Sequence, residues 1–277
     1  MKELLKTDLR RMLKDKLFLV AIFIGLGLAL FTPLIYKALV LVLEEAAEME
    51  DIFGMLFTAK GILGTSFAPL NNFGLILPVF LAIIIYKDFS YGTIRNKIIS
   101  GKSRVSIYLS LLISSSIIML ICILGYTLIQ FGFASLLFDY SMDLKFIEDL
   151  PYFTLTLLFG SLSYLFITFV IVFLCANMKN MGLAIVLYFG GCFLLTIIAT
   201  ITSTAHDALE MMSNQEVWTN IFGFLSNINL FYHLNFIIGL VEKYYISDLI
   251  YIVSSTVIFG GLFVLFGILL FRKKDLK

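Results

Sequence analysis

Six apolar runs without a single Asp, Glu, Lys or Arg constrain the fold of this chain more than any other feature. A membrane-spanning helix needs about 20 mostly apolar residues. The six runs are Leu17–Tyr36, Leu70–Tyr86, Val105–Phe138, Tyr152–Ala176, Gly182–Ser203 and Leu249–Phe271. The second run is short and the third is long, so the expected spans are about 17–36, 64–86, 105–131, 152–176, 182–203 and 249–271. The third run must either tilt or continue as an extracellular helix or loop beyond about Phe131.

The composition agrees with burial in lipid rather than in water. Hydrophobic residues make up 60% of the 277 residues and charged residues only 14%, with a mean hydropathy of +1.01. Soluble chains carry about 25% charged residues. We therefore expect an all-α polytopic membrane protein. No Pro- or Ser-rich linker divides the chain, so residues 1–277 are expected to form a single transmembrane domain.

The distribution of charge predicts the orientation of the six spans. Segments 1–16, 87–104, 177–181 and 272–277 hold sixteen of the twenty Lys and Arg residues and five of the nineteen acids. The segments on the opposite side hold four Lys residues and fourteen acids. Cytoplasmic loops are the ones enriched in Lys and Arg. This asymmetry predicts that the N and C termini are both cytoplasmic.

The first sixteen residues are predicted to form an amphipathic interfacial helix. Leu5, Leu9, Met12 and Leu13 fall on one helical face. The basic residues Lys6, Arg10, Arg11 and Lys14 lie outside that stripe. A helix of this kind is suited to lying on anionic lipid headgroups and anchoring the first span.

A further uncharged segment, Val217–Val241, leaves two interpretations open. It could cross the membrane as a seventh span, but Asn and His residues are costly in lipid without partners. It could instead form a re-entrant extracellular hairpin at 217–241 that turns near residues 226–229. We favour the hairpin, because a seventh crossing would place Arg272, Lys273 and Lys274 outside the cell.

Signatures of catalysis are missing from the sequence. It contains no G-x-x-x-x-G-K-[ST] loop for nucleotide phosphates and no H-E-x-x-H zinc motif. His206 and His233 have no Cys or His at ligand spacing, so surface or packing roles are expected and no metal. The spans also lack the ionisable side chains that ion-coupled carriers keep at membrane depth. The chain is therefore not expected to be an enzyme, to bind a cofactor or to bind nucleic acid.

The loop at 87–104 is the longest internal basic segment of the chain. Ser90 could cap a short helix there, and Gly101 with Ser103 could end it. Phe89, Ile94 and Ile98 would give the helix apolar faces. Physical arguments favour two interpretations equally. The segment is either a helix that inserts into a groove on a cytoplasmic partner or an ordinary solvated loop.

This loop resembles that of the permease subunits of ABC exporters of the second type, which include bacterial exporters of antimicrobial peptides, drugs and cations. In that family an acidic residue and an aromatic residue precede a Gly-Thr pair, a basic residue follows, and an Arg opens the third span. The residues in those places, with their neighbours in the loop, are Asp88, Phe89, Tyr91, Gly92, Thr93, Ile94, Arg95, Asn96 and Arg104. The order of amphipathic helix, six spans, loop and hairpin extends the resemblance over the whole chain.

The resemblance implies that the loop is a coupling helix for a cytoplasmic ABC ATPase, which would bind the ATP and Mg. It also implies a second permease half, either a homodimer partner or a sister subunit. The location would be a bacterial plasma membrane and the activity export, with an amphipathic or antimicrobial peptide as a candidate substrate. A self-sufficient ion channel or secondary carrier and a non-transporting scaffold or sensor subunit remain the alternatives.

Overall fold

The computed structural model describes residues 1–43, 58–70, 72–138, 150–212, 215–232 and 246–274. The described residues form helices and turns, with no strand among them. The helices, in chain order, are α1 (Lys2–Leu13), α2 (Lys16–Leu43), α4 (Ala59–Thr65), α5 (Asn72–Ser90), α6 (Thr93–Ile99), α7 (Arg104–Leu137), α9 (Leu150–Asn177), α10 (Met181–Glu210), α11 (Glu216–Ile228) and α13 (Ile246–Lys273).

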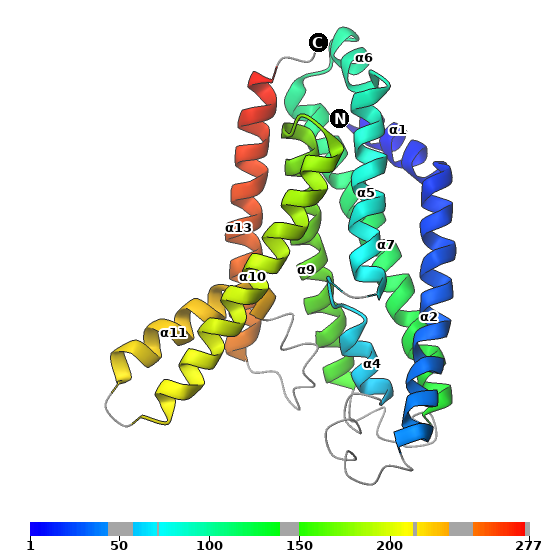
Figure 1. Ribbon diagram of the computed structural model, residues 1–277. Helices are drawn as coiled ribbons and strands as arrows, with labels where there is room; N and C mark the ends of the chain where they lie inside the picture. The colour runs from blue at the N-terminus through cyan, green and yellow to red at the C-terminus, as the bar shows by residue number, and fades with distance from the viewer. Residues whose placement is uncertain (44–57, 71, 139–149, 213–214, 233–245, 275–277) are drawn as a thin grey trace.

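Six of these helices, α2, α5, α7, α9, α10 and α13, are long and apolar enough to cross a membrane. They run alongside one another as an elongated bundle, with α1 lying across one end (Figure 1). Among the described residues, the all-helical fold and the six candidate spans are therefore as predicted. In lipid the backbone must satisfy its own hydrogen bonds, and helices do so within one segment. This architecture is that of a multi-pass membrane protein.

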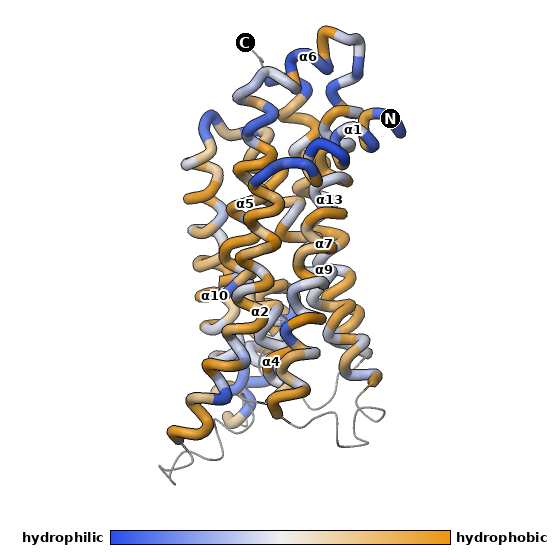
Figure 2. The backbone as a smooth tube through the Cα atoms, turned by 90° about the vertical axis from the view of Figure 1, so that its right-hand side faces the viewer, coloured by the Kyte–Doolittle hydropathy of each residue, from blue (hydrophilic) through white to orange (hydrophobic). Residues whose placement is uncertain are grey.

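Hydrophilic residues gather at the end of the bundle that carries α1 and α6, whereas the long helices are apolar along most of their length (Figure 2). Met1 and the C-terminal end of α13 both lie at this same end (Figure 1). We call it the basic end of the bundle. The sidedness of the membrane relative to this end stays a prediction.

α7 lies at the centre of the bundle and contacts α1, α2, α4, α5, α9 and α13. It is one continuous helix as far as Leu137, so the third apolar run does extend beyond Phe131 as a helix. One of its buried hydroxyls bonds within the helix, where Ser114 Oγ donates to the Ser110 carbonyl at 2.8 Å. Such local bonds remove the cost of placing serine in an apolar interior.

The second span begins later in the chain than the sequence suggested. Residues near Gly64 belong to the separate short helix α4, and α5 begins at Asn72, which has a φ of +46°. The connection is buried: Phe67 is fully enclosed, and Ser66 Oγ donates to Thr127 Oγ1 on α7 at 3.0 Å. α4 and the connection to α5 thus pack as a separate buried element beside α7 and do not extend the second span.

α10 and α11 pack against each other as a pair that leans away from the bundle at the end opposite α1 (Figure 1). The contact uses small residues of α11, since Gly223 and Ser226 are buried while Trp218 and Phe224 are exposed. α11 covers the first half of the predicted hairpin at 217–241. Residues 233–241 lie outside the described part of the chain, so the re-entrant path stays a prediction.

Close packing between α9 and the α4–α5 connection yields a test of this arrangement. A Cβ added at Gly160 would lie 2.3 Å from the ring of the buried Phe67. We expect Gly160→Ala to destabilise the protein by about 1–3 kcal/mol, the usual cost of overpacking, measured as a lower thermal unfolding midpoint in detergent. Gly132→Ala on α7 is the control, because its Cβ would meet nothing within 4 Å. Equal midpoints for the two variants would contradict the packing described.

Candidate functional site

The predicted coupling segment forms a short helix, α6, between two glycine turns at the basic end. Gly92 has a φ of +69° and occupies the N-cap position of α6, and Gly101 has a φ of +82° just after its last turn. Both values favour glycine. Gly101 N–H bonds to Ile98 O at 2.9 Å and Lys102 N–H to Lys97 O at 3.2 Å. These two bonds form a Schellman motif that closes the helix.

The predicted end of the helix at Gly101 is therefore confirmed, whereas the predicted start at Ser90 is wrong. Ser90 does not cap α6; it is the last residue of α5, and its Oγ donates to the Tyr86 carbonyl at 3.2 Å. Gly92 takes the cap position because the chain must reverse sharply there, and a left-handed residue makes that turn. Ser103 instead caps the following span, accepting from Ser106 N–H at 3.2 Å.

The residues of the loop motif divide into an anchored set and an outward set. Asp88 and Ile94 are buried, with 1% exposure each, and Phe89 packs on the core edge-to-face with Phe271. The exposed residues form what we call the outer surface of α6: Tyr91, Arg95, Asn96 and Ile99. Tyr91 is 76% exposed and Ile99 is 73% exposed. Thr93 is half-buried at the start of the helix.

A buried carboxylate on α1 ties this helix to α6 and α7. Asp8 has no exposed surface. Its Oδ1 lies 2.5 Å from Lys97 Nζ on α6, and its Oδ2 accepts from Ser110 Oγ on α7 at 2.7 Å. A buried charge must be paired to be tolerated. Three helices therefore meet at the single Asp8 side chain.

Two further ion pairs link α1 and its following turn to α5. The guanidinium of Arg11 pairs with the buried carboxylate of Asp88. Lys87 Nζ lies 2.8 Å from Asp15 Oδ1. Burial of the Asp15 carboxyl disfavours its ionisation, but hydrogen bonds from Lys87 and the Leu17 N–H outweigh this effect, so the pKa of Asp15 lies below its usual value. Asp15 is therefore charged at neutral pH, and its pair with Lys87 persists.

Arg104 and Lys274 donate hydrogen bonds to backbone carbonyls at the C-terminal ends of neighbouring helices, also at the basic end. Arg104 Nη1 donates to Arg272 O at 2.8 Å and to Lys274 O at 2.7 Å. Lys274 Nζ donates to Ala176 O at 2.8 Å and lies 5.3 Å from the centre of the Phe89 ring. Burial of its ammonium lowers the pKa of Lys274. Cations suit these positions because helix C-termini carry unsatisfied carbonyls and partial negative charge.

The acidic side of this network was not predicted from the sequence. Arg11 was expected on the lipid-facing surface of the first helix, whereas it faces the protein and pairs with Asp88. Asp8 and Asp15 were given no role. The available signal was the spacing of these two acids, seven residues apart in the segment expected to form one helix at 1–16, which places them on one face.

The ion pair between Asp8 and Lys97 gives a direct test of the network. We expect Asp8→Ala to destabilise the protein by about 3–5 kcal/mol, the usual cost of leaving a buried charge unpaired, measured by thermal unfolding in detergent. Lys97→Met should also destabilise, and the double variant should cost less than the sum of the two single changes. Additive losses would show that the two side chains do not interact. Arg95→Met, on the exposed side of α6, is the control and should leave the midpoint unchanged.

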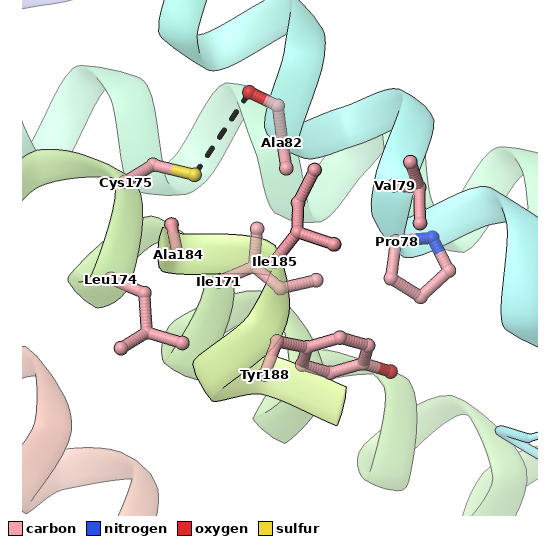
Figure 3. A pocket seen from close by; sticks show the side chains of 9 residues that line it. All are labelled: Pro78, Val79, Ala82, Ile171, Leu174, Cys175, Ala184, Ile185 and Tyr188. Carbon is pink, nitrogen blue, oxygen red and sulfur yellow. Dashed lines mark hydrogen bonds between the residues drawn. The ribbon is translucent and has the colours of Figure 1, made fainter. Parts of the chain in front are cut away.

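Neither of two cavities in the bundle is large enough for a drug-sized ligand, which needs about 300 Å³ or more. One, of about 10 Å³, lies between α5, α9 and α10, and Figure 3 shows its lining, with Cys175 Sγ 3.9 Å from Ala82 O. The other, of about 180 Å³, lies between α2, α5 and α7 and is lined mostly by apolar groups, including Gly25 and Gly125. Both belong to the packing of the helices.

One cluster of side chains near the end of α10 could hold a cation. The ligand atoms of His206, Asp207 and Glu210 lie within 4.8 Å of one another, and both carboxylates are exposed. His206 also has a packing role, because its Nδ1 donates to Thr219 O on α11 at 3.0 Å. This bond joins α10 to α11 far from the basic end.

Comparison with known proteins adds no family to this description. No family model, no curated protein and no solved structure matches the chain. The fold therefore defines the class as a multi-pass helical membrane protein, and its function has to be argued from its own residues.

Proposed function

We propose that this chain is the membrane-spanning permease subunit of an ATP-driven ABC exporter. In this proposal a separate cytoplasmic ATPase binds the outer surface of α6, and the chain itself carries no catalytic residue. The proposal rests on the resemblance of the loop at 88–104 to the coupling segment of such permeases. It also places the basic end of the bundle, with both termini, in the cytoplasm.

The observation that carries the proposal is the contrast between the two sides of α6. One side is fixed by the buried Ile94 and by the ion pair from Lys97 to Asp8. The other side presents Tyr91 and Ile99, which are large and mostly exposed at the end of the molecule where hydrophilic residues gather. A solvated loop between two spans would need neither the anchoring nor the exposed apolar residues. Contiguous exposed apolar patches mark protein interaction sites, and the proposal takes Tyr91 and Ile99 as parts of one such patch.

A second permease half is part of the proposal. The cavities described within one bundle are small and apolar, so a substrate path is expected between two bundles rather than inside one. Both a homodimer and a pair with a sister subunit fit this arrangement. An amphipathic, cationic peptide is the proposed substrate class, supported by the resemblance and by the exposed acids Asp207, Glu210 and Glu216 at the end opposite α6.

Affinity purification of the chain from its native membrane in mild detergent tests the proposal. We expect a stoichiometric protein with phosphate-loop and ABC signature motifs to co-purify. We expect Arg95→Glu combined with Ile99→Glu to reduce the recovered ATPase at least tenfold, because it places two negative charges on the contact surface. Both side chains are exposed, so the thermal midpoint of the variant should match that of the wild type.

Ser100→Glu combined with Lys102→Glu is the matched control, since it also adds two acids to exposed positions beside α6. It should retain most of the ATPase. Gly92→Pro is a poor test, because proline cannot adopt the positive φ of Gly92 and would disrupt the turn itself. Absence of any ATPase in several mild detergents would contradict the proposal. Ion flux through the purified chain would then favour a channel or carrier.

The proposed orientation is testable by cysteine labelling, because Cys122, Cys175 and Cys192 are all buried. We expect Ser100→Cys, at the basic end, to react with a membrane-impermeant maleimide only after the cells are opened. Glu210→Cys, at the other end, should react in intact cells. The reverse pattern would place the basic end outside and exclude a cytoplasmic partner for α6.

A further inference from the structure

α1 presents two opposite surfaces, of which the ion-pair network uses only one. Leu4, Asp8 and Met12 are buried against the bundle. Four basic residues, spaced four apart, lie on the opposite side and are all exposed; this basic stripe is Lys2, Lys6, Arg10 and Lys14. At about 100° per residue the stripe winds around the helix side that faces away from the protein.

None of these four cations forms an ion pair among the residues that the structure describes. The exposed Glu3 lies on the same side of the helix, so four cations and one acid leave this side with a net charge of +3. This contrasts with Arg11, Lys87 and Lys97 nearby, each of which pairs with an aspartate. The fold therefore neutralises the inward cations of this region and leaves the outward ones available for a ligand. That ligand must be anionic.

The position of α1 identifies the ligand as a membrane lipid. Only Lys14 and Asp15 separate α1 from α2, whose exposed residues Leu19, Val20 and Phe23 begin the span directly. α1 therefore lies at the level of the lipid headgroups. Leu5, Leu9 and Leu13 are partly exposed and follow the edge of the helix beside the basic stripe. An exposed apolar edge flanked by Lys and Arg is the pattern of a helix that binds an anionic membrane surface.

The buried surface of α1 connects this lipid contact to α6. Asp8 holds Lys97 of α6, and Arg11 holds Asp88 at the end of α5, just before the Gly92 turn. A displacement of α1 must therefore either move α6 with it or break a buried ion pair. We propose that anionic lipid headgroups bind the basic stripe of α1 and thereby fix the position of α6. By linkage, a change in the position of α6 also changes the affinity of α1 for the lipid.

The test uses the purified full-length chain without any partner, so its outcome is independent of the proposed function. The chain is reconstituted in nanodiscs of phosphatidylcholine alone or with phosphatidylglycerol added. Native mass spectrometry counts the phosphatidylglycerol retained on the protein, and hydrogen exchange measures protection of the α6 amides. The wild type is expected to retain phosphatidylglycerol and to show several-fold slower α6 exchange when it is present.

Lys2→Gln with Lys6→Gln and Arg10→Gln removes three charges from the stripe and is expected to abolish both effects. Lys102→Gln with Lys179→Gln and Lys273→Gln removes three exposed charges elsewhere at the basic end and should behave as the wild type. Retention of phosphatidylglycerol by the stripe variant would overturn the lipid site. Loss of the lipid in that variant, with α6 exchange in the wild type unaffected by phosphatidylglycerol, would overturn the link to α6.

Discussion

The arrangement of the basic end depends on the removal of two carboxylates, Asp8 and Asp88, from water. A buried charge tolerates little freedom in its surroundings, because any loss of its partner leaves the full desolvation cost uncompensated. Each aspartate therefore fixes the helix that supplies its cation: Lys97 fixes α6, and Arg11 fixes α1. The buried apolar residues Met12 and Ile94 already turn one side of α1 and one side of α6 toward the core. The two acids add specific partners to this packing.

The type and number of the long helices could be predicted from the sequence because a bilayer admits so few backbone structures. A long uncharged run has to be a helix, and six such runs give six helices. The predicted start of the second span was wrong because of local packing. The start of α5 moved to Asn72 because α4 and Phe67 pack as a separate buried element. Apolar composition alone cannot distinguish such an element from the end of a span.

The candidate site was predicted in part, and the division follows from the physics of each residue. Gly101 could be identified because few residues other than glycine adopt a positive φ, and the structure has it there. The partners of Asp88 and Lys97 could not be identified, because they lie 77 and 89 residues away in the sequence. A single sequence gives no measure of which of several cations will face an acid across that distance. The partition of α6 into anchored and exposed sides therefore required the structure.

The two glycine turns that bound α6 have a consequence for how the protein could change over evolutionary time. Gly92 and Gly101 isolate seven helical residues whose backbone is set by the turns and whose inward side chains are set by the core. Tyr91, Arg95 and Ile99 contribute little to either constraint, since they are exposed. Substitutions at these three positions can therefore accumulate without loss of folding. The identity of whatever binds this surface can diverge between lineages while the membrane bundle beneath it stays the same.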